Sequence, residues 1–123
     1  MHERYLPTHE WARAEGEEVV IGLSDFAARE VGDVVHVGLP KVGAELRRGV
    51  ACAEIESVKS VHDFYSPLDG TVTAVNDQLA QRPELVNQEP LGAGWFVRVR
   101  PASASWAEGL LTAEQYRAQL GLP

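Results

Sequence analysis

The sequence predicts a mainly β fold, a barrel or sandwich of short antiparallel strands with a small helix toward each end. Short runs of β-branched and apolar residues alternate with turn signals at the close spacing typical of small all-β domains. With 123 residues, the chain can form one modest core without a metal or a disulfide. Its 45% hydrophobic and 24% charged residues are ordinary for a globular domain. We therefore expect a single domain over residues 1–123.

The helix near the start of the chain is predicted by the residues at its two ends. Residues 18–23 are rich in β-branched side chains and predict a strand that leads into it. Ser24 is a suitable helix N-cap, and Asp25 lies in the first turn, where its negative charge interacts favourably with the helix dipole. Gly32 can adopt the left-handed conformation that ends a helix. The short helix is therefore expected near 25–31.

The remaining elements are strands between turns, followed by a helical tail. Thr112 and Gln115 fit the capping-box pattern, and Gly121 marks the end of the C-terminal helix. We expect this helical tail over 103–123 and an N-terminal extension over 1–17. A loop that enters a short strand is predicted at 5–13, and a helical turn around 84–86. The other strands are predicted at 33–39, 50–58, 61–65, 71–75 and 95–100.

Lys59 stands between two similar segments of the chain. Residues 39–46 and 66–72 each combine a Pro/Gly turn with the start of a strand. If they belong to two halves related by a local two-fold axis, Lys59 lies at the tip of a hairpin. The strands predicted at 50–58 and 61–65 would form the two arms of that hairpin.

Lysine is unusually scarce in this chain. Of its 11 basic residues only Lys41 and Lys59 are lysines, and the others are arginines. Arginine can replace lysine for surface charge, but it carries no primary amine that can be acylated. An isolated lysine at a hairpin tip is ordinarily a solvated surface charge. The composition nevertheless suggests that the amine of Lys59 is needed for itself.

Charge and cysteine content argue against several classes of partner. The net charge of −7 and the sequence pI of about 5.0 disfavour binding to nucleic acid or to anionic membrane. Residues 1–7 lack an apolar signal core and an Arg/Ser-rich transit pattern, and no apolar run reaches membrane-spanning length. Cys52 is the single cysteine, which fits a reducing compartment. We expect a cytoplasmic protein with no nucleic-acid or membrane partner.

The sequence shows no recognisable catalytic or metal-binding constellation. His9 with Glu10 and His62 with Asp63 are adjacent pairs, which is not a metal-ligand spacing, so we predict no metal site. Cys52 lies among small strand residues and is expected to be structural. Without a basic groove for nucleic acid, the tryptophans are expected to be packing anchors: Trp11, Trp95 and Trp106.

The stretch around Lys59 resembles the lipoylation segment of the H protein of the glycine cleavage system. Residues 56–59 and then 63–72 follow the family's pattern. Biotin carriers usually place methionine on both sides of the lysine, and lipoyl domains of 2-oxoacid dehydrogenases usually have Asp-Lys-Ala. Here Val58 and Ser60 flank Lys59. The resemblance covers nearly the whole chain, with further matches in order at 8–11, 21–27, 32–35, 39–40, 83–87 and 94–95.

The resemblance implies a fold and a cofactor. The fold would be a flattened lipoyl/biotinyl-type β-barrel sandwich with quasi two-fold halves. Lipoic acid would be joined by an amide to Lys59, with Glu56, Ser57 and Val58 contributing to recognition by the lipoate-attachment enzymes. Small departures from the family pattern at 60–62 are expected to affect the rate of attachment and to leave the attachment site unchanged.

The resemblance also implies a carrier with no catalytic turnover of its own. In this family the lipoyl arm takes an aminomethyl group from the P protein (glycine decarboxylase) to the T protein (aminomethyltransferase). The L protein (dihydrolipoamide dehydrogenase) then reoxidises the dithiol. The loaded arm rests in a cleft, and the matching cleft residues here are Thr8, Glu10 and Asp63. A carboxylate can pair with the ammonium of the cargo, and a hydroxyl can hydrogen-bond to it.

Two other functions compete with this interpretation. The chain could act mainly as a lipoyl donor or relay for 2-oxoacid dehydrogenases, but such a donor would not need a cleft for an amine. An independent enzyme would need a catalytic constellation, which the sequence lacks. A carrier that meets several partners in turn is expected to be a monomer.

Overall fold

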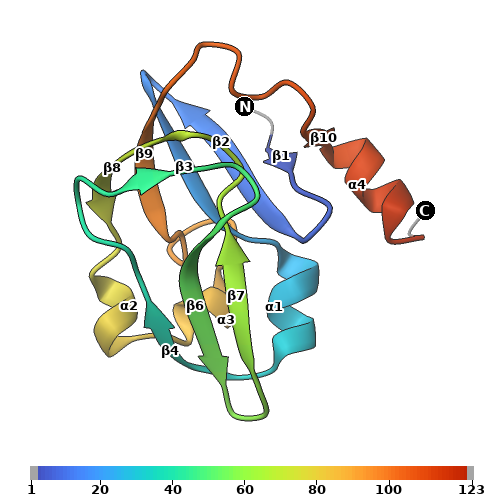
Figure 1. The fold of residues 1–123 in the computed structure, drawn as a ribbon. Helices are drawn as coiled ribbons and strands as arrows, with labels where there is room; N and C mark the ends of the chain where they lie inside the picture. Colours follow the sequence, from blue (N-terminus) through green and yellow to red (C-terminus); the bar gives the residue numbers. More distant parts are fainter. Residues whose placement is uncertain (1–2, 122–123) are drawn as a thin grey trace.

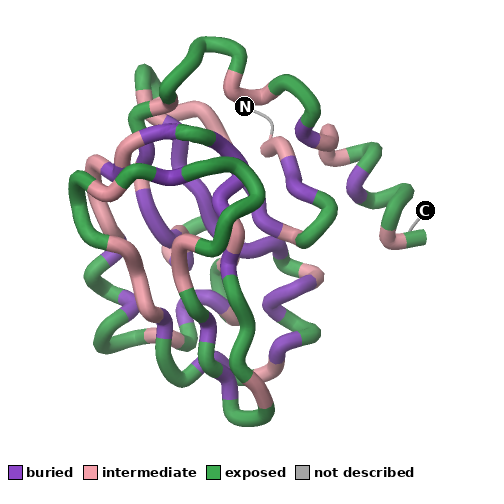
Figure 2. The backbone as a smooth tube through the Cα atoms, in the orientation of Figure 1, coloured by how far each residue is buried: buried purple, intermediate pink, exposed green. Residues whose placement is uncertain are grey.

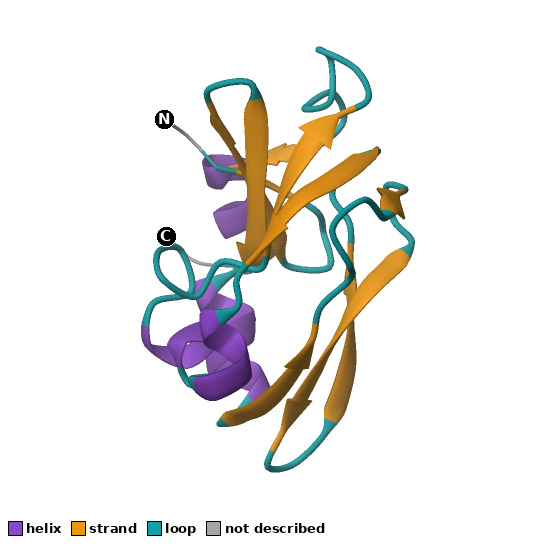
Figure 3. Cartoon of the chain, turned by 90° about the vertical axis from the view of Figure 1, so that its left-hand side faces the viewer, coloured by secondary structure: helices purple, strands orange, loops and turns teal. Residues whose placement is uncertain are grey.

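Two antiparallel sheets face each other across the core, with short helices at their edges (Figures 1 and 3). The computed structural model describes residues 3–121. The larger sheet has the strand order β10-β1-β2-β3-β9-β8-β5, and the smaller has the order β4-β6-β7. The strands are β1 (Arg4–Tyr5), β2 (Glu10–Glu15), β3 (Glu18–Leu23), β4 (Val34–Gly38), β5 (Glu45–Leu46), β6 (Ala51–Ser57), β7 (Val61–Tyr65), β8 (Gly70–Val75), β9 (Val97–Pro101) and β10 (Leu111–Thr112).

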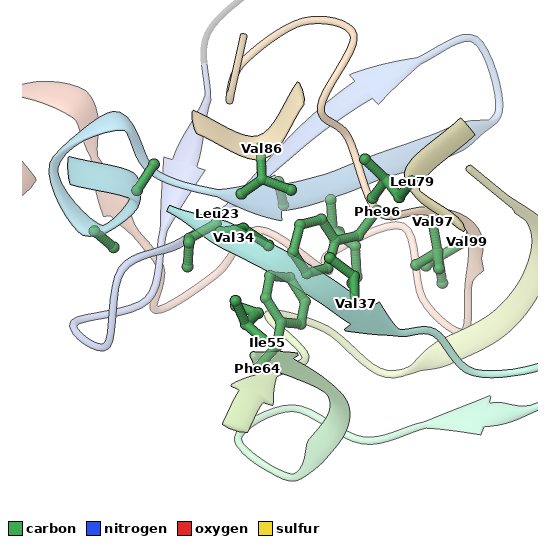
Figure 4. Close-up of a cluster of buried hydrophobic side chains, with 14 of the residues drawn as sticks. Leu23, Val34, Val37, Ile55, Phe64, Leu79, Val86, Phe96, Val97 and Val99 are labelled. Carbon is green, nitrogen blue, oxygen red and sulfur yellow. The ribbon is translucent and has the colours of Figure 1, made fainter. Parts of the chain in front are cut away.

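Aromatic and aliphatic side chains from both sheets meet in the core (Figure 4). Phe64 on β7 stacks on Phe96 beside β9, with ring centroids 4.4 Å apart and planes 23° from parallel. Ile55 on β6 is 1% exposed, whereas the residues on either side of it in the strand are exposed. This alternation is the period-2 pattern that half-buried strands require. It places one face of the β6–β7 hairpin on the core and the other toward solvent.

The predicted mainly β architecture, with a helix at 25–31 and another near the C-terminus, is confirmed. Helix α1 (Asp25–Val31) begins after Ser24, whose Oγ accepts a hydrogen bond from the amide of Ala27 at 3.1 Å. Helix α4 (Ala113–Gln119) begins with the complete capping box of Thr112 and Gln115. Two single-turn helices follow β8: α3 (Leu85–Gln88) overlaps the helical turn predicted around 84–86, whereas α2 (Gln78–Gln81) was not predicted.

The ends of the chain are more closely joined to the sheet than expected. Within the predicted extension at 1–17, strand β2 pairs with β3 along its whole length, and Trp11 is fully buried. Within the predicted helical tail at 103–123, the helix occupies 113–119 and is preceded by turns and by β10, which pairs with β1. The parts of these predictions at 1–2 and 122–123 lie outside the described residues.

The two similar segments that flank Lys59 pair with each other. Strand β5 aligns antiparallel with β8, so that Glu45 lies opposite Thr71. The turn that precedes β5 also contacts β8, since the Gly43 amide donates to the Val72 carbonyl at 2.8 Å. This pairing closes one end of the molecule around the base of the β6–β7 hairpin. In the described part of the chain, no helix combines the length and apolar character needed to cross a membrane.

Candidate functional site

Lys59 lies at the exposed tip of the β6–β7 hairpin, as the sequence predicts. Glu56 and Val61 form the last cross-strand pair, and the Ser57 amide donates to the Ser60 carbonyl at 2.8 Å to close the turn. Figures 1 and 2 show this turn projecting from the foot of the molecule. Lys59 is exposed, and the flanking Val58 and Val61 are 69% and 59% exposed. The lysine amine is therefore accessible to another protein.

The main chain of this turn is fixed by a buried serine hydroxyl. Ser57 is 7% exposed, and its Oγ accepts hydrogen bonds from the amides of Lys59 and Ser60 at 3.3 and 3.2 Å. Of the residues predicted to guide recognition, Glu56 and Val58 are exposed. Any influence of Ser57 on recognition would act through the shape of the turn, because its side chain faces inward. The turn thus holds the base of the lysine while the amine stays free.

The turn is also attached to the segment that links α1 to β4. The Val58 amide donates to the Asp33 carbonyl at 2.9 Å, and the stem of Lys59 lies over Gly32. Asn87 on α3 holds this segment in place. Its Nδ2 donates to the carbonyls of Ala28 and Gly32 at 3.0 and 2.8 Å, and its Oδ1 accepts from the Val34 amide at 2.9 Å.

The residues predicted to form a cleft lie around one cavity. Thr8, Glu10 and Asp63 all line a cavity of about 270 Å³ between α1, the start of β2 and the β7 strand. Asp63 is four residues beyond Lys59, and because a strand rises about 3.3 Å per residue, it lies at most roughly 13 Å along the hairpin. A flexible arm attached to Lys59 can be directed along β7 into this cavity.

Glu10 is a buried carboxylate held by two donors. It is 1% exposed, Thr8 Oγ1 donates to its Oε1 at 2.5 Å, and the Tyr65 amide donates to its Oε2 at 3.0 Å. Burial raises the pKa of Glu10 above its ordinary value, and these hydrogen bonds lower it by a smaller amount. A buried carboxylate of this kind gains a strong partner when a cation enters beside it.

Three polar lining residues were not predicted as part of the cleft. Glu30 from α1 adds a third carboxylate, and His9 and His62 add two imidazoles. Burial lowers the pKa of the His9 imidazole, and the charge of Glu30 raises it by less. Glu30 and His62 have no local sequence signature, because only the fold brings α1 and β7 to the same cavity.

The cavity brings together the two His-carboxylate pairs that were noted in the sequence. Despite this proximity, no group of three or more His, Cys, Asp or Glu side chains among residues 3–121 is arranged to hold a metal ion. Burial raises the pKa of the Cys52 thiol to about 12, which disfavours the reactive thiolate. What the site offers is an accessible primary amine next to an acidic cavity that can hold a small cation.

Comparison with known proteins points to one family. A model of the family described as glycine cleavage H-protein matches residues 3–121. The glycine cleavage system H protein of Bacillus cytotoxicus is 49% identical over 115 residues, which cover 94% of this chain and 91% of that protein. The Bacillus cereus protein of the same name is 49% identical over 113 residues, which cover 92% of this chain and 89% of that protein.

A solved structure gives the same result. The crystal structure of a glycine cleavage system H protein from Mycobacterium marinum superimposes with a TM-score of 0.90 at 35% sequence identity. The superposition covers 98% of both chains. The fold, the exposed hairpin lysine and the extent of these matches lead to one conclusion: the chain belongs to the glycine cleavage H-protein family.

Proposed function

We propose that this protein is the lipoyl carrier of a glycine cleavage system, with Lys59 as the attachment point. The observation that carries the proposal is the exposed Lys59 on a turn whose main chain is fixed, in a chain that belongs to this family. When bound, the lipoyl group supplies a dithiol that can be loaded with the aminomethyl group of glycine. The protein presents, positions and protects that group, and the carbon chemistry belongs to its partners and their cofactors.

The hairpin tip meets the chemical requirements of an attachment site. A lysine amine is cationic at neutral pH and must lose its proton before it is acylated, so it has to enter the active site of another enzyme. Lys59 can do so because it is exposed on the turn between β6 and β7, where the neighbouring Val58 and Val61 are exposed as well. The Ser57 and Asp33 hydrogen bonds limit movement at the base of the arm.

The cavity suits a cargo that carries a positive charge. Glu10 and Asp63 can pair with the ammonium of an aminomethyl group, and the Thr8 hydroxyl can accept a hydrogen bond from it. The surrounding apolar residues, including Phe26 and Ile55, keep water from the labile carbon–sulfur bond. This acidic cavity favours the carrier role over that of a lipoyl donor for 2-oxoacid dehydrogenases, which would not need a site for an amine.

The same proposal names the partners and the location. The P, T and L proteins and the lipoate-attachment enzymes would each engage the hairpin in turn, and the net charge of −7 favours partners with basic surfaces. No catalytic turnover is assigned to the chain itself. The cytoplasmic location is supported by the single cysteine, because the protein needs no disulfide.

The test uses the only two lysines of the chain as a matched pair. Wild type, Lys59→Arg and Lys41→Arg, each purified from a lipoylating host, are mixed with P, T and L proteins, glycine, tetrahydrofolate and NAD+, which accepts the electrons when the dithiol is reoxidised. We expect wild type and Lys41→Arg to support glycine cleavage and Lys59→Arg to support none. Full turnover with Lys59→Arg would rule out Lys59 as the attachment point.

A further inference from the structure

His9 adopts a backbone conformation that is rare for its residue type. Its φ is 87°, and it is the only non-glycine residue with positive φ among residues 3–121. Such conformations persist only where the surrounding structure holds them, and they concentrate at functional sites. His9 also lines the acidic cavity, between two residues of the proposed cargo site, Thr8 and Glu10.

The conformation of His9 explains how its two neighbours meet. Thr8 and Glu10 are separated by a single residue, and in an extended strand such residues point to the same face without bonding to each other. Here the left-handed turn at His9 brings Thr8 Oγ1 to 2.5 Å from Glu10 Oε1. The same turn is closed by the His9 amide, which donates to the Leu6 carbonyl at 3.0 Å.

The side chain of His9 is held from the C-terminal helix. Its Nδ1 lies 2.6 Å from the hydroxyl oxygen of Tyr116 on α4, and that hydroxyl lies 2.7 Å from Ser24 Oγ. The Ser24 amide donates to the His9 carbonyl at 2.9 Å, so Ser24 contacts His9 both directly and through Tyr116. Tyr116 is 3% exposed and stacks on Tyr5 with parallel rings 4.2 Å apart.

Helix α4 is therefore joined to the cavity although it does not line it. Figure 1 shows α4 beside β1, well away from the Lys59 turn. We infer that Tyr116 is a positioning residue: through its hydrogen bond to His9 it holds the left-handed turn that aligns Thr8 with Glu10. Through Tyr116, helix α4 thereby contributes to the geometry of the proposed cargo site. The nature of the cargo rests on the proposed function, but the link between Tyr116 and Glu10 does not.

The test measures Glu10 in the full-length chain without a lipoyl group, so it is independent of the proposed function. The carboxyl carbon of Glu10 is titrated by NMR in wild type, Tyr116→Phe and Tyr5→Phe. We expect the pKa of Glu10 to rise in Tyr116→Phe, because its ionised form loses alignment with the Thr8 hydroxyl that stabilises it. Tyr5→Phe removes a hydroxyl from the same ring stack, keeps the bond between Tyr116 and His9, and should leave the titration unchanged.

A second pair of variants, which carry His9→Gly, shows whether Tyr116 acts on Glu10 through His9. Glycine adopts positive φ without support, so in His9→Gly the further change Tyr116→Phe should not alter the Glu10 titration. The other titratable lining residues, Glu30, His62 and Asp63, are the same in every variant. The inference is overturned if Tyr116→Phe leaves the pKa of Glu10 unchanged or lowers it, or if the shift is equally large in the His9→Gly background.

Discussion

The stem of Lys59 lies directly over Gly32, the residue at which α1 ends. A Cβ added to Gly32 would stand 3.1 Å from Lys59 Cε. Gly32 has φ 83° and ψ −168°, a combination that is essentially restricted to glycine. The hairpin tip therefore rests on a backbone whose course depends on one residue, and the attachment site includes the end of α1 as well as the turn itself.

Gly32→Ala should destabilise the protein by about 1–3 kcal/mol, because alanine is strained in this conformation. The contact with Lys59 contributes less, since a flexible lysine stem can move aside. Urea unfolding gives the free energy of unfolding. The control is Gly92→Ala, at an exposed position where the nearest atom to an added Cβ is 3.6 Å away. An equal effect of the two substitutions would contradict the special role of Gly32.

Asn87→Ala should loosen the support of the hairpin tip. Its three side-chain hydrogen bonds connect the end of α1 to the start of β4, and their loss should cost about 1–3 kcal/mol. Hydrogen exchange of the Val58 amide, which bonds to Asp33, should become faster. The adjacent and exposed Gln88→Ala should change neither quantity appreciably. Unchanged exchange at Val58 in Asn87→Ala would show that Asn87 does not support the turn.

Glu10 should make stability fall as the pH rises. Burial raises the pKa of Glu10 in the folded state above its ordinary value of 4.5, which applies to the unfolded chain. At pH values between the unfolded and the folded pKa, the folded state therefore binds more protons than the unfolded state. The stabilising contribution of its protonated form is complete below the unfolded pKa and is lost as the pH rises through the folded pKa. Glu10→Gln removes this titration.

The check is the difference in free energy of unfolding between wild type and Glu10→Gln, measured across this range. The difference should shift against wild type as the pH rises above about 4.5 and level off above the folded pKa. Subtracting the two curves cancels the titration of the other carboxylates. A difference that is constant or shifts in favour of wild type with rising pH would contradict the buried, destabilised charge.

Removing charge from the cavity should shorten the life of the loaded arm. Loss of one charge-assisted hydrogen bond, about 1.5–3 kcal/mol, corresponds to release roughly 10-fold faster or more in Glu10→Gln and Asp63→Asn. Release is followed as formaldehyde and ammonia from the loaded protein without T protein. Glu54→Gln is the matched control, because Glu54 is the cross-strand partner of Asp63 but does not line the cavity. Release from Glu10→Gln at the wild-type rate would refute the cleft role.

Local signals made much of this fold predictable from the sequence. The Ser24 cap and the capping box at Thr112 determine helix starts through residues three positions apart, and both are confirmed. The hairpin around Lys59 follows from two strand-forming runs with a short turn between them. In each case the interacting residues are close in sequence, so the physical cause is visible in a short window.

The missed features depend on partners far apart in the chain. Strand β10 has only two residues, and its pairing partner is β1, where Arg4 lies opposite Thr112 although more than a hundred positions separate them. Asn87 supports the Lys59 turn from another helix, and no local pattern distinguishes it from an exposed asparagine. Glu10 likewise resembles a surface charge in sequence, and only the packing around it shows that it is buried.

Intact-mass analysis after enzymatic lipoylation shows directly whether Lys59 carries the lipoyl group. Wild type, Lys41→Arg and Lys59→Arg are incubated with a lipoate-attachment enzyme, ATP and lipoate, with the Bacillus cereus H protein as a positive control. We expect one lipoyl adduct on wild type and on Lys41→Arg, mapped to Lys59 by peptide analysis, and none on Lys59→Arg. An adduct that persists in Lys59→Arg, or an unmodified wild type beside a modified positive control, would contradict this expectation.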